Sequence, residues 1–103
     1  MNKHEMRQYI AELETRVDMA LNKWKKESRI ENGEAVQIEW QYEQSHVIID
    51  VFWEDDAESI VLQCINPRFG WRHHWKSLSK ENVNRIMDRV GNFAQIIQTK
   101  TKE

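Results

Sequence analysis

The chain has 103 residues and a mass of 12.5 kDa, which is close to the usual size of one domain and too small for a second independent core. Apolar residues make up 40% and charged residues 31% of the chain, so the composition predicts a folded domain and not a disordered segment. With three Gly and one Pro, the sequence favours a few long elements over many short strands.

The cysteine and apolar content restrict the environment of the protein. Cys64 is the single cysteine, which excludes an intrachain disulfide and a zinc motif built on paired cysteines. The longest aliphatic run is 47–49, far too short for a membrane span, and the N-terminal residues lack the apolar stretch of a signal peptide. We therefore expect a cytoplasmic protein that does not associate with membranes and has no cofactor.

The first predicted element is a long amphipathic helix from about His4 to Lys26. Its apolar residues recur at gaps of three and four over five turns, which is the spacing of one buried helix face. At about 1.5 Å per residue this helix would be about 34 Å long. The residues of this face are Met6, Ile10, Leu13, Val17, either Ala20 or Leu21, and Trp24.

Three strands are predicted next, over 36–43, 47–53 and 59–65. The first alternates strictly, with an apolar or aromatic residue at every even position, which is typical of a strand with one buried face. Closing the first hairpin around Gln44 and Ser45 pairs Trp40 with Ile49 and brings only apolar residues together on one face. The same parity places Cys64 on that buried face as a small apolar residue.

The chain after residue 65 predicts a further short element and a second helix. Residues 66–78 contain a Pro and a Gly but alternate aromatic residues, which fits either a loop or a short edge strand. Ser79 is a good N-cap for a helix from Lys80 to about Gln98, with apolar residues again at helical spacing. The fold class expected is α+β: a long N-terminal helix, a three- or four-stranded antiparallel sheet and a C-terminal helix, with both helices on one face of the sheet in a single domain, 1–103.

Charge is distributed unevenly along the chain, although the net charge is only -2. Residues 35–66 carry seven acids and neither Lys nor Arg, whereas residues 67–103 carry eight basic residues and three acids. The predicted register places Glu39 opposite Asp50 on the other face of the sheet, where Ile48 would lie beside Ile65 and Phe52 beside Val61. An apolar surface rimmed with acid predicts contact with a basic protein partner. It is also compatible with an ordinary solvated surface, or with one that another segment covers.

A second candidate surface is the segment 68–76, which interleaves cations with aromatic rings. Such a segment can bind single-stranded nucleic acid, can form a protein contact, or can complete the core while its cations face solvent. The sequence pI of about 6.1 is low for a dedicated nucleic-acid module, which makes nucleic acid the second choice. The candidate partner-binding residues are Glu39, Asp50, Phe52, Asp55, Asp56, Arg68, Trp71, Arg72 and Trp75.

Catalysis and metal binding find little support in the sequence. His73 and His74 are adjacent and would point to opposite faces of a strand, so no metal site is predicted. Glu39 and Asp50 could form an acid–base pair, but there is neither a nucleophile beside a base nor a glycine-rich phosphate loop. The sequence therefore predicts a non-catalytic protein-binding module, such as an adaptor, a chaperone-like protein or an inhibitor of the kind that phages and other mobile elements encode.

Self-association is the last expectation. A helix of about 34 Å would extend beyond strands of about 23 Å, leaving part of its apolar face without cover. A symmetric homodimer would bury that overhang, with Met6 and Ile10, or Leu21 and Trp24, at the join.

Overall fold

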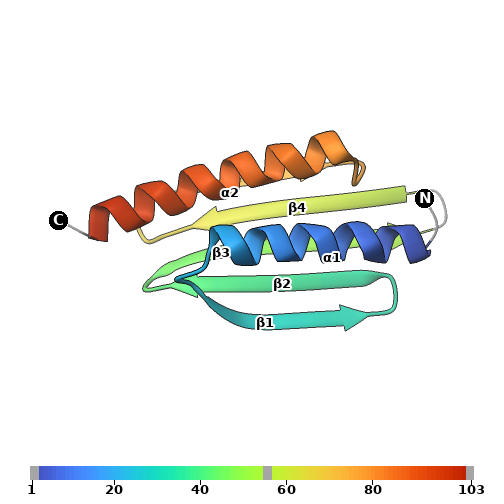
Figure 1. The fold of residues 1–103 in the computed structure, drawn as a ribbon, viewed down its shortest axis with the longest axis horizontal. Helices are drawn as coiled ribbons and strands as arrows, with labels where there is room; N and C mark the ends of the chain where they lie inside the picture. Colours follow the sequence, from blue (N-terminus) through green and yellow to red (C-terminus); the bar gives the residue numbers. More distant parts are fainter. Residues whose placement is uncertain (1–2, 55–56, 102–103) are drawn as a thin grey trace. The chain divides into compact units, whose positions relative to one another are not determined.

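The computed structural model describes residues 3–54 and 57–101 as two helices and five strands. Along the chain these are α1 (Lys3–Ala20), β1 (Lys25–Asn32), β2 (Ala35–Tyr42), β3 (Ser45–Glu54), β4 (Ala57–Ile65), β5 (Gly70–Trp75) and α2 (Lys80–Thr101) (Figure 1). The strands form one antiparallel sheet in the order β1-β2-β3-β4-β5. The predicted α+β class is confirmed, but the sheet has five strands and not three or four.

The chain divides into a helical unit, formed by the segments before Lys23 and after Ser77, and a sheet unit, Lys23–Ser77. The expectation that both helices cover one face of the sheet stays a prediction. The two helices pack against each other and run in the same general direction (Figure 1). Arg16 of α1 donates a hydrogen bond to the Asn84 side chain of α2 at 2.9 Å. Within the described residues, neither helix is long and apolar enough to cross a membrane.

The second helix begins where the sequence predicts. The Ser79 hydroxyl accepts a hydrogen bond from the backbone N–H of Asn82 at 3.1 Å, as an N-cap residue does. The helix continues to Thr101, three residues beyond the predicted end. Its predicted apolar face is confirmed for the buried residues Val83, Ile86, Val90, Phe93, Ala94 and Ile97.

The first helix is shorter than predicted. It ends at Ala20, and the last turn is closed by the Leu21 N–H donating to the Val17 carbonyl at 2.8 Å. The residues from Lys25 onward form β1 and not a continuation of the helix. Trp24 is nevertheless buried, and its ring centroid lies 5.5 Å from that of Tyr42 on β2. Leu21 and Trp24 lie in the turn after the helix and are buried there. Their positions match the helical spacing by chance, which is why the predicted helix was too long.

These lengths remove the argument for a homodimer. With 18 residues, α1 is about 27 Å long. With ten residues, β3 is about 33 Å long, so the predicted excess of the first helix over the strands in length is absent. The four residues expected at the dimer join, Met6, Ile10, Leu21 and Trp24, are all buried in the single chain.

The hairpin between β2 and β3 has the predicted parity but a register shifted by two residues. Its turn residues are Glu43 and Gln44, not Gln44 and Ser45, so Trp40 pairs with Val47 and Ile38 pairs with Ile49. The predicted pairing of Trp40 with Ile49 is therefore wrong. Glu43 has a φ of 55°, the left-handed conformation that a two-residue hairpin turn requires. A shift by two residues keeps every side chain on its predicted face, because side chains alternate with a period of two.

The side chains of one face of the sheet are mostly buried, and those of the other face are mostly exposed or half-buried. These are called the buried face and the exposed face. The buried face contains all the even-numbered apolar residues of β2, and Cys64 is fully buried as predicted. Lys26 of β1 lies over the Trp40 ring, with its Nζ atom 5.7 Å from the ring centroid. The fully or nearly buried residues of this face are Val36, Ile38, Trp40, Val47, Ile49, Val51, Trp53, Ile60, Leu62 and Cys64.

Trp40 gives the sharpest test of the buried face. The Trp40 side chain is 1% exposed, so Trp40→Ala should lower the free energy of unfolding by about 3 to 5 kcal/mol. Ile30, which is 55% exposed, is the control, and Ile30→Ala should cost about 1 kcal/mol or less. Urea denaturation followed by far-UV circular dichroism measures both. Equal losses for the two variants would contradict the assignment of the faces.

The β2–β3 turn gives a second test. A left-handed conformation costs a residue with a Cβ atom about 1 to 2 kcal/mol, and Gly escapes that cost but loses more entropy on folding. Glu43→Gly should therefore raise the free energy of unfolding by about 0.5 to 1 kcal/mol. Gln44→Gly is the matched control and should lower it, because among the described non-glycine residues only Glu43 has a positive φ. Thermal melts of the two variants and the wild type decide the sign.

Candidate functional site

The exposed face of the sheet carries apolar and acidic side chains together. Its most exposed apolar residues lie on three different strands: Ile30 on β1 at 55%, Phe52 on β3 at 43% and Ile65 on β4 at 39%. Ile48, half-buried, belongs to the same face. The acids Glu39 and Asp50 lie among them on the two strands β2 and β3. Alternation along each strand brings these side chains to one surface.

Glu39 and Asp50 are neighbours across the hairpin, but they are not directly opposite each other as predicted. Glu39 pairs with Ile48, and Asp50 pairs with Gln37 on β2 and with Val61 on β4. The two acids are thus diagonal neighbours, which reduces the like-charge repulsion that a direct pair would have. The shifted turn is the cause.

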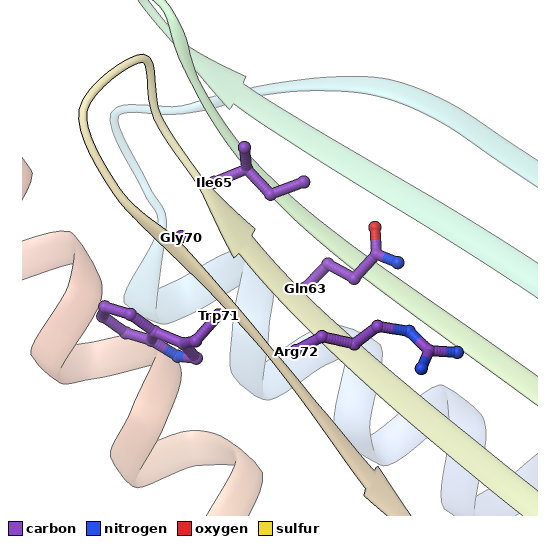
Figure 2. A pocket seen from close by; sticks show the side chains of 5 residues that line it. All are labelled: Gln63, Ile65, Gly70, Trp71 and Arg72. Atoms are coloured by element: carbon purple, nitrogen blue, oxygen red, sulfur yellow. The ribbon is translucent and has the colours of Figure 1, made fainter.

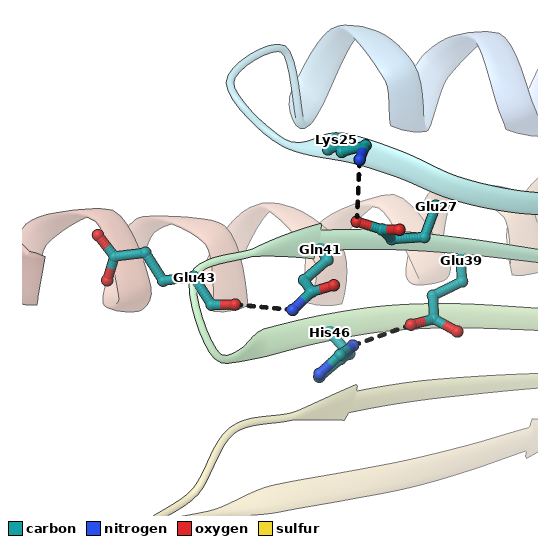
Figure 3. Close-up of polar contacts among 6 residues, drawn as sticks. All are labelled: Lys25, Glu27, Glu39, Gln41, Glu43 and His46. Atoms are coloured by element: carbon teal, nitrogen blue, oxygen red, sulfur yellow. Dashed lines mark hydrogen bonds and ion pairs between the residues drawn. The ribbon is translucent and has the colours of Figure 1, made fainter.

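Glu39 has a partner at its other diagonal position. His46 donates a hydrogen bond from Nδ1 to the Glu39 carboxylate at 2.9 Å (Figure 3). Both side chains are about one-third exposed, at 33% for His46 and 30% for Glu39. The pair orients the Glu39 carboxylate while Asp50 remains beside the apolar Val61.

The apolar neighbours on this face also differ from the prediction. Ile48 lies opposite Gln63 and not beside Ile65, and Ile65 lies opposite His46. Phe52 lies opposite Ser59 and not beside Val61. Ile48 and Ile65, like Phe52 and Val61, are consequently diagonal neighbours across β3 and β4 and not directly opposite pairs.

Two of the predicted acidic site residues, Asp55 and Asp56, lie outside the described residues. Glu54 and Ala57 flank them and pair with each other at the end of the β3–β4 hairpin.

The basic and aromatic segment divides between the two faces of the sheet. Arg72 and His74 are on the exposed face, whereas Trp71 and Trp75 are half-buried and belong to the other face. Arg68 precedes the strand in an exposed loop, where the Asn66 side chain accepts hydrogen bonds from the backbone N–H groups of Arg68 and Phe69 at 2.8 and 3.0 Å. The structure therefore does not bring Arg72 and the two Trp rings together on one surface.

The adjacent histidines follow the same alternation. His73 pairs with Leu62 and His74 pairs with Val61, so they lie on opposite faces as predicted. His74 Nε2 is 2.9 Å from the Ser59 hydroxyl. In the described part of the chain, no three His, Cys, Asp or Glu side chains gather in a group that could hold a metal ion.

A shallow depression of about 350 Å³ lies at one end of β4 and β5 (Figure 2). Gln63, Ile65 and Arg72 extend from the exposed face beside Gly70, which has no side chain (Figure 2). Sequence reasoning singled out Arg72 but missed Gln63, Ile65 and Gly70 as its neighbours. Gly70 carried a signal, because a glycine within a strand pattern often marks a close approach of backbone. A Cβ atom at Gly70 would lie 3.2 Å from the Cys64 carbonyl oxygen.

Strand β1 contributes residues that the sequence analysis placed in a helix or a turn. Ile30 adds an exposed apolar side chain next to Gln37. Lys25 and Glu27 form a weak ion pair at 3.9 Å near the end of the strand (Figure 3). No apolar alternation marks this strand, so the sequence offered no signal for it.

Comparison with protein-family models, with curated proteins and with solved structures returns no significant match.

The Glu39–His46 pair gives a prediction about the energetics of this face. Because both side chains are partly exposed, their interaction should contribute about 1 kcal/mol or less to stability. A double-mutant cycle with Glu39→Gln and His46→Gln, measured by urea denaturation, gives this coupling energy. A coupling energy well above that value would show that the pair is shielded from water.

Proposed function

We propose that this protein is a non-catalytic protein-binding module that contacts its partner through the exposed face of the sheet. One observation carries the proposal: the exposed apolar residues Ile30, Phe52 and Ile65 lie on the same sheet face as two acids. Monomeric proteins rarely leave large apolar patches in water without a use, and protein interfaces combine apolar anchors with a polar rim.

The charge of this region supports a partner with a basic surface. Glu39 and Asp50 lie within residues 35–66, which contain seven acids and neither Lys nor Arg. Charges of this kind steer a basic partner and fix its orientation, while the apolar residues supply most of the affinity. An adaptor, a chaperone-like protein and an inhibitor all act in this way, and we propose action in the cytoplasm.

Binding of nucleic acid through 68–76 receives less support. A single-strand platform needs cations and stacking rings on one surface. Strand alternation places Arg72 on one face of the sheet and Trp71 and Trp75 on the other.

Affinity capture with matched variants tests the proposal. In the double variant Ile30→Thr with Phe52→Thr, the two most exposed of the three apolar anchors are lost while β-branched side chains keep the strands favourable. Met19→Gln is the control, because Met19 on α1 is 73% exposed but is not part of the sheet. Nuclease-treated extract from the native host should give a protein that wild type and Met19→Gln retain and that the double variant loses at least about tenfold.

The capture is run with untreated and nuclease-treated extract, and it has three distinguishable outcomes once circular dichroism shows that the double variant is folded. Loss of the captured protein only with the sheet variant supports the exposed face as the contact. Equal retention by all three proteins would refute this face, and capture that disappears on nuclease treatment would favour nucleic acid.

A further inference from the structure

We propose that β5 is an open sheet edge to which an extended acidic segment of the partner adds as a sixth strand. This inference rests on the proposed function, since it presupposes a protein partner. It adds a second contact, distinct from Ile30 and Phe52, and specifies the conformation and charge of the segment that binds there.

The two edges of the sheet differ in how they are protected. Strand β1 carries charges at five of its eight positions, and its pairing with β2 is interrupted by a bulge between Lys26 and Ser28. Both features prevent another strand from pairing with an edge. Strand β5 pairs regularly with β4 from Gly70 to Trp75, without a bulge, a proline or a lysine. The edge at β5 thus lacks the usual protection.

The backbone geometry shows which groups face outward from β5. The Asn66 N–H donates to the Phe69 carbonyl at 2.9 Å in the connection between β4 and β5. Hydrogen-bonded pairs alternate with non-hydrogen-bonded pairs in an antiparallel ladder, so the backbone groups of Trp71, His73 and Trp75 face β4. Those of Gly70, Arg72 and His74 face the open edge. These three residues are exposed, and within residues 3–54 and 57–101 no strand pairs with this side of β5.

The charge near this edge favours an acidic occupant. From Asn66 to Lys80 the chain contains basic residues and no Asp or Glu. Among the described residues, no acidic side chain pairs with the exposed Arg72 guanidinium. A guanidinium that lacks a carboxylate partner is a strong donor for one supplied by a ligand.

The depression beside Gly70 provides a place for one side chain of the added strand. Gln63 and Arg72 offer N–H donors at its wall, and Ile65 offers an apolar surface (Figure 2). In binding by strand addition, backbone hydrogen bonds give affinity and such depressions select alternate side chains. A Glu or Asp side chain matches this set of donors.

A second copy of the chain is a poorer occupant. The outward-facing residues of two antiparallel β5 strands would pair with each other, and the register that pairs all three, Gly70 with His74 and Arg72 with Arg72, sets two guanidinium groups directly opposite each other. Like charges directly opposite each other destabilise a sheet. An acidic strand removes this repulsion.

The test uses the full chain and synthetic eight-residue peptides that alternate Glu with Val. In ¹⁵N NMR titrations, the Glu peptide should shift the amide signals of Gly70, Arg72 and His74 and slow their hydrogen exchange. A peptide with Lys in place of Glu should bind at least about tenfold more weakly. Two further Glu peptides are N-methylated at every second amide, with the two patterns offset by one residue. The peptide whose methyl groups face β5 should not bind, whereas the peptide whose methyl groups face away from β5 should bind.

Matched arginine variants complete the experiment. Arg72→Gln should weaken binding of the Glu peptide by about tenfold, whereas Arg29→Gln on the protected edge β1 should not change it. Equal binding of the Glu and Lys peptides would overturn the proposal. Undiminished binding of both N-methylated peptides would also overturn it. Protection of the β5 amides from hydrogen exchange that rises with protein concentration, without peptide, would assign the edge to a second copy. Shifts of the Gly70, Arg72 and His74 amide signals on addition of oligothymidylate would assign the edge to nucleic acid.

Failure here is separable from failure of the proposed function. If the peptides do not bind but the Ile30 and Phe52 double variant still loses the captured partner, the exposed face is the contact and the edge is not. If capture is unaffected by that double variant, the exposed-face proposal fails whatever the peptides do.

Discussion

The two-residue turn between β2 and β3 is the constraint on which the arrangement of the exposed face depends. Glu43 adopts a left-handed conformation at a φ of 55°, and Tyr42 and Ser45 close the hairpin. This turn sets which residue of β2 lies opposite which residue of β3, whereas the register between β3 and β4 follows from their own hairpin, which Glu54 and Ala57 close. A turn displaced by one residue at each end would move each cross-strand pair by two positions along β3.

The consequence for the exposed face is electrostatic. In the observed register Glu39 has His46 on one diagonal and Asp50 on the other, and Ile48 lies directly opposite it. The acids are thereby kept apart, while the Arg72 guanidinium of the same face lies on β5 at the far edge. The exposed face thus changes from acidic at β2 and β3 to basic at β5. A partner that meets both regions would need charges of both signs in a matching order.

The two edge strands explain how one sheet can be protected on one side and open on the other. Strand β1 is rich in charge and contains a bulge, and it is held to β2 by its backbone pairing and by Lys26 over the Trp40 ring. Strand β5 is short and regular, and Gly70 allows it to approach β4 closely at its first residue. An open edge of this kind is a liability for a protein in isolation, and a binding site when a suitable strand is present.

Local pattern in the sequence determined the faces of β2, β3 and β4, the buried state of Cys64 and the start of α2, because period-two alternation and N-cap chemistry act within a few residues. The same pattern placed Glu39, Asp50 and Phe52 on one face, and only the structure added Arg72 to it. Only the tertiary structure decided that Lys25–Asn32 is a strand. This segment is held to β2 by backbone hydrogen bonds, and its side chains do not alternate between apolar and polar, so the sequence shows no strand pattern there. The tertiary structure also decided the two-residue shift of the hairpin, the separation of Arg72 from Trp71 and Trp75, and the depression at Gly70. These features depend on backbone conformation and on contacts between strands, and neighbouring residues in the sequence do not specify them.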